Sequence, residues 1–293
     1  MRILVALDTN PYSKYVVHEV AKLAMNTWAD VTLLGVESRK PASSLNGAQS
    51  LLDLPIVRKL REFREEFLGY FKDESVSPYA RKRWDYELVD RGKGLLEEMC
   101  VCKGMKEFRV RIRFGQPTKQ VLAEAAEEQS DLIVLGCSKG EQCTWEQDRN
   151  APEKIVKGAP CSVLVVKEEK KPNKIVCCLD HDSVSQESLE LMNQMVTLHQ
   201  TDLTLVGLTE SDHLKEEVDR KMKQILQYYT AQKIKAWVSV VDVSMLDRFV
   251  ADAAEKGLIA LWMGQRSLIG KFFSQDRVRK LVRGAQSSVL ILR

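Results

Sequence analysis

Short, continuous apolar runs recur along the chain, and each is followed by a polar turn and a helical pattern. Residues 3–7 (ILVAL) end at Asp8, and residues 175–179 (IVCCL) end at Asp180. Runs of this length predict strands that are buried on both faces, as in parallel sheets. Apolar residues then recur at helical spacing, and a further apolar run follows at residues 31–36 and 203–208. The pattern predicts a strand–helix–strand unit at the start of each half.

The carboxyl-terminal parts of the two halves also match. The segment that leads to Gly136 matches the one that leads to Gly264, and the segment after Gly158 matches the one after Gly284. The spacing between the two matched glycines is the same in both halves, except that the second half is two residues shorter there. Self-similarity over this length indicates an internal duplication.

Strands that alternate with helices predict parallel βαβ units with right-handed crossovers. We therefore expect an α/β fold with two doubly wound, mostly parallel five-stranded sheets and flanking helices. A charged stretch with a proline, residues 167–174, has the composition of an exposed linker. It divides the chain into domains 1–170 and 171–293.

The first half carries an insertion between its second and third strands, at residues 39–106, with a helical part at about 39–80. A narrow apolar seam runs along this part through Ile56, Leu60, Phe63, Phe67 and Tyr70. Two interpretations remain open. The seam packs on its own domain, or the helix around Ile56–Phe71 contacts a second copy or a protein partner.

Charge and composition exclude several classes of function. The formal net charge is +3, which gives no strong field to hold nucleic acid. No apolar run reaches the roughly 20 residues of a membrane helix, and the amino terminus lacks a signal-peptide core. Seven cysteines without C-x-x-C spacing favour reduced thiols. We expect a cytoplasmic protein without a membrane or nucleic-acid partner.

The sequence also lacks the usual catalytic and metal-binding patterns. The four histidines fit no Ser-His-Asp arrangement, no G-x-S-x-G elbow occurs, and Cys100 and Cys102 lack zinc spacing. Asp180 and Asp182 flank His181 in a turn, where capping of the next helix is the better interpretation. We expect no catalytic residue and no metal site. Cys137 stands apart because Lys139 lies close enough in sequence to lower its pKa.

Three segments together resemble a universal stress protein domain: the strand that ends at Asp8, the run LIVLG at residues 132–136, and the closing run APCSVLVV at residues 159–166. The second half is similar to the same family, so the chain resembles a tandem universal stress protein. The resemblance implies an adenine nucleotide alpha hydrolase-like fold. It also implies pairing of the two domains through their fifth strands, residues 161–167 and 287–293, in antiparallel orientation. Pairing would protect two apolar edges.

The nucleotide-binding branch of this family has a loop of the form G-x2-G-x9-G-[S/T], whose glycines let backbone N–H groups approach phosphate. Here Gly136 and Gly264 match the first glycine, but side chains stand at the later positions. They are Lys139, Arg149 and Asn150 in the first half and Ser267, Gln275 and Asp276 in the second.

The resemblance further implies nucleoside contacts after the first strand and near the end of the second. Helix capping is the alternative for Asp8 and Asp180. The candidate ligand-binding residues are Asp8, Val36, Gly136, Lys139, Gly140, Arg149 and Asn150 in the first half, and Asp180, Leu208, Gly264, Ser267 and Gly270 in the second. If either half holds ATP or AMP, we expect the first. Lys139 and Arg149 of its loop could donate to an anion, whereas Asp276 in the second half would repel one.

Three functional hypotheses follow. The first is a non-enzymatic stress-response protein with degenerate nucleotide loops that acts through a partner or a regulatory ligand. The second is an ATP- or AMP-binding switch with slow ATP hydrolysis. The third is a thiol sensor based on Cys137.

Overall fold

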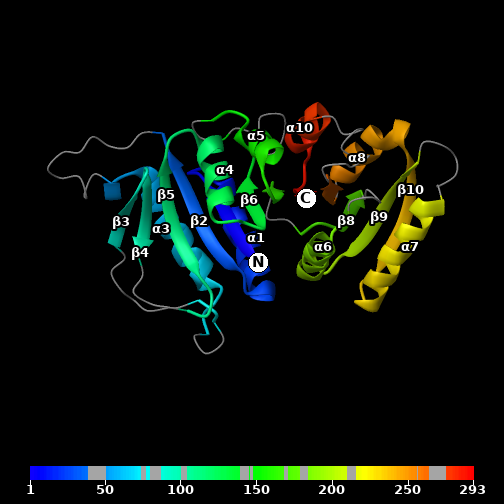
Figure 1. Ribbon diagram of the computed structural model, residues 1–293, viewed down its shortest axis with the longest axis horizontal. Helices are drawn as coiled ribbons and strands as arrows, with labels where there is room; N and C mark the ends of the chain where they lie inside the picture. The colour runs from blue at the N-terminus through cyan, green and yellow to red at the C-terminus, as the bar shows by residue number, and fades with distance from the viewer. Residues whose placement is uncertain are drawn as a thin grey trace. The chain divides into compact units, whose positions relative to one another are not determined.

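The computed structural model describes residues 1–38, 51–73, 77–79, 87–99, 104–138, 145, 148–167, 171–178, 184–209, 216–255, 257–263 and 275–293. The chain forms two compact units. The first contains Met1–Ser138 and extends to Cys161, and the second contains Ser162–Arg293. Each unit has a sheet with helices on both faces (Figure 1).

The first unit is built on parallel strands in the order β6-β1-β2-β5. Helices α1 and α3 pack together on one face, and α4 and α5 pack together on the other. Proline stands in the first turn of α3, α4 and α5, where its missing N–H costs nothing. The bounds are β1 Arg2–Leu7, α1 Tyr12–Thr27, β2 Asp30–Glu37, α3 Pro55–Gly69, β5 Phe108–Phe114, α4 Pro117–Glu127, β6 Leu132–Gly136 and α5 Ala151–Gly158.

The second unit repeats this order as β11-β8-β9-β10, with β12 beside β11. The doubly wound α/β fold expected from the sequence is therefore confirmed. The bounds are β8 Lys174–Cys178, α6 Gln186–His199, β9 Asp202–Thr209, α7 Glu216–Ala231, β10 Ala236–Asp242, the 3₁₀ turn Val243–Met245, α8 Leu246–Ala254, β11 Leu258–Trp262, α10 Gln275–Gly284 and β12 Val289–Leu292.

Strand β7 (Ser162–Val166) lies in the second unit, although it closes the first repeat in sequence. It pairs antiparallel with β12, with Val165 opposite Val289 and Val163 opposite Ile291. Both strands are buried along their whole length. The expected antiparallel pairing of these two apolar strands is confirmed. The compact units thus differ from the repeat boundary near Lys170 by this one strand.

The helical insertion covers its own sheet, which settles the open question about the apolar seam. Ile56, Leu60, Phe63 and Phe67 are buried in the first unit. The ring of Phe67 stacks on Phe108 of β5 with a centroid distance of 4.7 Å. The idea of a partner surface along this seam was wrong, because the same apolar side chains form the core under α3.

Gly35 lets α3 approach the sheet closely. A Cβ on Gly35 would lie 2.6 Å from Cγ1 of Ile56 and 2.7 Å from Cδ1 of Leu60. Only glycine leaves room for these side chains against β2. This close packing fixes α3 as the crossover helix between β2 and β5.

The insertion also contains a β-hairpin that the sequence analysis missed. Strands β3 (Glu87–Gly92) and β4 (Leu95–Met99) pair antiparallel, and β4 adds to the outer edge of β5. The sequence of β4, LLEEM, does not alternate between apolar and polar residues, so it does not predict a strand without its partner. The first sheet is therefore longer than the five-stranded pattern.

Buried ion pairs attach the hairpin and α4 to β5. Arg111 reaches Glu97 of β4 at 2.6 Å, Glu124 of α4 at 2.7 Å and Glu128 at 2.6 Å. Glu124 also pairs with Arg113. Burial alone would lower the pKa of Arg111, but the hydrogen bonds that its guanidinium group donates to the three carboxylates outweigh burial and raise that pKa. The cluster stays ionised and joins three elements on one face of the sheet.

Candidate functional site

The strand order of the first unit reverses direction between β1 and β6, which pair side by side with Ala6 opposite Leu135. In doubly wound sheets the ligand crevice opens at the carboxyl ends of the strands on either side of this reversal. Asp8 follows β1, and Gly136 ends β6. The fold thus brings two sequence-predicted site residues to one place.

The carboxylate of Asp8 is buried and is occupied by hydrogen bonds from the turn that follows it. Oδ1 accepts from Ser13 Oγ at 2.8 Å and from Asn10 N at 3.1 Å. Oδ2 accepts from Tyr12 Oη at 2.5 Å and from Asn10 Nδ2 at 2.6 Å. These contacts match the capping interpretation, in which Asp8 organises the entry to α1.

The ring of Tyr12 fills the space beside Gly136. A Cβ on Gly136 would lie 2.4 Å from Tyr12 Cδ2 and 3.0 Å from Val16 Cγ2. Gly136 therefore has a packing role: it admits an aromatic ring of α1 against the end of β6. Sequence reasoning missed Tyr12, whose only signal is its place four residues after Asp8.

Each unit has one adenine-side candidate, near the end of its second strand. Val36 is buried near the end of β2, and Leu208 is half-buried near the end of β9. Their role beside a base stays a prediction.

The start of α5, where the family loop would place phosphate, is poor in free backbone donors. Asn150 precedes the helix with φ 65°, and Ala151 N donates to the carbonyl of Asp148 at 3.1 Å. Pro152 has no N–H to offer. Arg149 is exposed in this turn. Since helix N-termini bind phosphate through free N–H groups, this one offers little to an anion.

Two buried carboxylates also lie at this helix start. Asp148 accepts from Thr118 Oγ1 at 2.5 Å and from Lys154 Nζ at 2.5 Å, and Glu153 is 2% exposed. Burial alone would raise the pKa of Asp148, but the bonds from Lys154 and Thr118 outweigh it and lower that pKa. Asp148 is therefore ionised and joins α5 to the start of α4. The ammonium group of Lys154 offsets its negative charge.

The remaining candidates lie outside the described residues. These are Lys139, Gly140, Asp180, Gly264, Ser267 and Gly270. Their roles stay predictions.

The cysteines divide into two groups. Cys161, Cys177 and Cys178 form no disulfide, and burial raises the pKa of Cys178 to about 12. Cys137 is disulfide-bonded. The expectation of reduced thiols throughout was therefore wrong at Cys137, which lies directly after β6.

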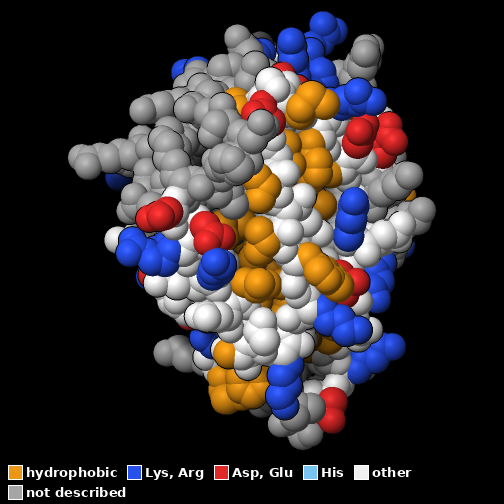
Figure 2. All heavy atoms as spheres, turned by 90° about the vertical axis from the view of Figure 1, so that its right-hand side faces the viewer, with side chains coloured by type: hydrophobic (Ala, Val, Ile, Leu, Met, Phe, Trp, Pro, Cys, Tyr) orange, Lys and Arg blue, Asp and Glu red, His pale blue; other side chains and the backbone are white. Residues whose placement is uncertain are grey.

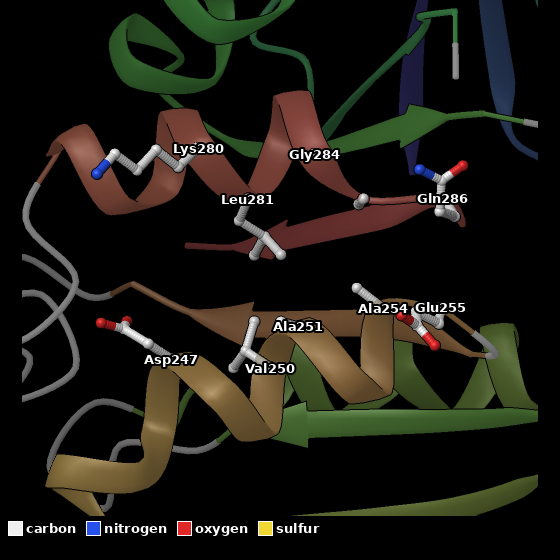
Figure 3. Close-up of a pocket in the computed structure, with 10 residues that line it drawn as sticks. Asp247, Val250, Ala251, Ala254, Glu255, Lys280, Leu281, Gly284 and Gln286 are labelled. Atoms are coloured by element: carbon white, nitrogen blue, oxygen red, sulfur yellow. The ribbon is translucent and has the colours of Figure 1, made fainter. Parts of the chain in front are cut away.

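The second unit has a groove between α8 and α10, with a volume of about 580 Å³. In Figure 3, Val250 and Leu281 point toward each other across it. Asp247 and Lys280 lie toward one end and Glu255 and Gln286 toward the other. The walls are therefore apolar, and charged groups lie at the ends.

The groove exists because the second repeat has lost a packing contact of the first. In the first unit, a Cβ on Gly158 would lie 2.8 Å from Leu122 Cδ1, so α4 and α5 are in close contact. The matching residues are Val250 and Gly284, and nothing lies within 4 Å of a Cβ on Gly284. The shorter side chain leaves space between the helices.

No group of three or more His, Cys, Asp or Glu side chains in the described residues is placed to hold a metal ion. Within the same residues, no helix is long and apolar enough to cross a membrane.

Comparisons with known proteins agree with this architecture. The family model described as "Universal stress protein family" matches residues 1–167. A Staphylococcus aureus (strain USA300) protein named as a universal stress protein is 25% identical over 171 residues, which is 58% of this chain and 86% of the relative.

Two solved structures share the fold along nearly the whole chain. A universal stress protein from Archaeoglobus fulgidus has a TM-score of 0.60 at 12% identity, covering 100% of this chain and 96% of the other. A protein of unknown function from Pseudomonas aeruginosa PAO1 has a TM-score of 0.57 at 15% identity, covering 99% and 92%.

The strand order and the helices on both faces of the sheets define a doubly wound α/β protein. With the family match over more than half of its length, the chain belongs to the universal stress protein family.

Proposed function

We propose that this chain is a non-enzymatic, cytoplasmic universal stress protein with two tandem domains divided near Lys170. It acts by binding a partner or a regulatory ligand. The observation that carries this proposal is the packing of Tyr12 in the first unit. Tyr12 packs on Gly136 and donates to Asp8, so the protein's own side chain uses the groups that a nucleoside would need.

The start of α5 supports the same proposal. A phosphate there would find Pro152 in place of a donor, and the N–H of Ala151 already donates to Asp148. A shortage of backbone donors weakens anion binding. Both observations support the proposal of a degenerate loop.

The groove between α8 and α10 supports the regulatory-ligand part of the proposal. Its volume of about 580 Å³ and its apolar walls are typical of small-molecule sites. Native mass spectrometry of the purified chain tests whether a ligand is retained. If one is retained, Gly284→Leu should fill the groove and release it.

Calorimetric titration with ATP–Mg²⁺ and with AMP tests the degenerate-loop proposal. We expect no micromolar binding and no phosphate release above background. Micromolar binding would restore the alternative, an ATP- or AMP-binding switch with slow ATP hydrolysis. In that case Asp8→Ala should weaken binding and Asp180→Ala should not, because we place any nucleotide in the first domain.

A further inference from the structure

Strand β10 ends the second unit's sheet with an apolar edge. Among the described strands, only β9 pairs with it. The side chains of Trp237, Val238 and Val240 are 51%, 39% and 47% exposed. Figure 2 shows a stripe of hydrophobic side chains on the side of the molecule that carries β10 and α7, with lysines and arginines around it.

The first unit shows what this edge accepts. Strand β5 has the same place in the strand order, and its outer edge binds β4 as an antiparallel strand. Where β5 carries Arg109, Arg111 and Arg113 in ion pairs, β10 carries Trp237, Ser239 and Val241. The chain between β9 and β10 contains α7 and has no length for a hairpin. Among its described residues, the second repeat thus has the acceptor edge without a strand that covers it.

The edge also lacks the usual protection against strand pairing. Residues 236–241 (AWVSVV) contain no proline and no charged residue. Natural edge strands are normally interrupted by such residues or covered. An uninterrupted apolar edge indicates a pairing surface.

The backbone orientation of β10 fixes which groups are available. Leu203 N of β9 donates to the carbonyl of Lys235 at 3.0 Å, so Lys235 faces β9. Because backbone groups alternate sides along a strand, the N–H and C=O groups of Ala236, Val238, Val240 and Asp242 point to the outer edge.

We propose that a second copy of this chain pairs with this edge, β10 against β10, antiparallel about a two-fold axis at Ser239. In this register Val238 lies opposite Val240 of the second copy, and Trp237 lies opposite Val241. The residues whose backbone groups point to the outer edge then pair with one another: Ala236 with Asp242, and Val238 with Val240. Each of these pairs is a hydrogen-bonded pair. The sequence is therefore complementary to itself in the register that pairs the whole strand, as a two-fold interface requires.

The charges at the two ends of β10 also favour antiparallel pairing with a second copy of the chain. The exposed Lys235 stands before β10, and Asp242 ends it. Antiparallel pairing brings the basic start of one strand to the acidic end of the other. A parallel arrangement would bring like charges together.

A cross-linking experiment on the full chain tests the register. In this arrangement Ser239 faces itself in a non-hydrogen-bonded pair, whose Cα atoms lie about 4.5 Å apart, within the range of a disulfide. Ser239→Cys should therefore give a covalent dimer under mild oxidation, with the linked peptide identified by mass spectrometry. Thr197→Cys, at an exposed position of α6, is the control and should not. Equal cross-linking of the two variants would overturn the proposal.

Sedimentation of the purified chain tests the association itself. Over about 1–100 µM, where a modest interface associates, we expect a reversible dimer. Val238→Lys, at an already exposed site, should weaken dimerisation at least tenfold without changing the melting temperature. Thr197→Lys adds the same charge to α6 and should leave the dimer intact. A monomer throughout this range, or a dimer that Val238→Lys does not weaken, would exclude the β10 interface.

Discussion

Tyr12 and Gly136 are matched in shape: a ring carbon of Tyr12 lies 2.4 Å from the point where any side chain at position 136 would begin. The family's first loop glycine is thus kept here for packing an aromatic residue of α1 against β6. The same ring carries the hydroxyl that reaches Asp8. The two residues together hold the start of α1 against the end of β6.

Gly136→Ala should destabilise the first unit by about 1–3 kcal/mol, because the added methyl group forces Tyr12 and Val16 out of place. Gly284→Ala is the control, since its Cβ would meet nothing within 4 Å. It should be neutral or slightly stabilising, by a few tenths of a kcal/mol to about 1 kcal/mol. Chemical denaturation measures both. Equal effects would show that the close contact has no energetic consequence.

The buried ion cluster makes a second prediction. Glu124 is fully buried between Arg111 and Arg113, so Glu124→Gln leaves two guanidinium groups short of a charge and should cost about 3–5 kcal/mol. Glu127 pairs with Arg113 from a side chain that is 59% exposed. Glu127→Gln should cost at most about 1 kcal/mol. If urea denaturation gives similar losses for both, burial does not control the strength of these pairs.

Acid should destabilise the first unit through the same contacts. Burial alone would raise the pKa of Glu97 and Glu128, but Arg111 and its neighbouring arginines outweigh it, so both pKa values lie below the ordinary 4.5. At a pH between the lower pKa of the folded state and the ordinary pKa of the unfolded state, the unfolded chain therefore binds more protons than the folded chain. Stability is therefore complete above about pH 4.5 and is lost as the pH falls through the lower, folded pKa values.

The melting temperature measured from pH 7 to pH 3 checks this dependence. It should stay level to about pH 5 and then fall. Glu97→Gln removes one of the titrating groups and should give a shallower fall. A variant that follows the same curve as the unmodified chain would assign the acid sensitivity to other carboxylates.

The pairing of β7 with β12 makes a further prediction. Val165 is fully buried opposite Val289, so Val165→Lys places an ammonium group in an apolar contact and should cost several kcal/mol. Because β7 lies in the second unit, amide exchange should accelerate in β12. Unchanged exchange in β12 would mean that β7 contributes nothing to the second unit.

Much of the fold follows from local patterns. The apolar runs at residues 3–7 and 175–179, the helical spacing after them and the repeat around Gly136 and Gly264 were enough for the doubly wound architecture. These features depend on hydrophobic period and on turn residues, which a sequence shows directly. The antiparallel meeting of β7 and β12 was also predictable, because two apolar edge strands need cover.

The sequence could not show contacts between residues that are distant in the chain. The apolar seam of α3 has the same pattern whether it covers β5 or a partner, and only packing against Phe108 decides. The hairpin β3–β4 depends on Arg111, which lies beyond it in sequence. The candidate site follows the same rule. Residue types placed Asp8 and Gly136 near each other, but the tertiary structure put Tyr12 between them, because side-chain volume is filled in space and not along the chain.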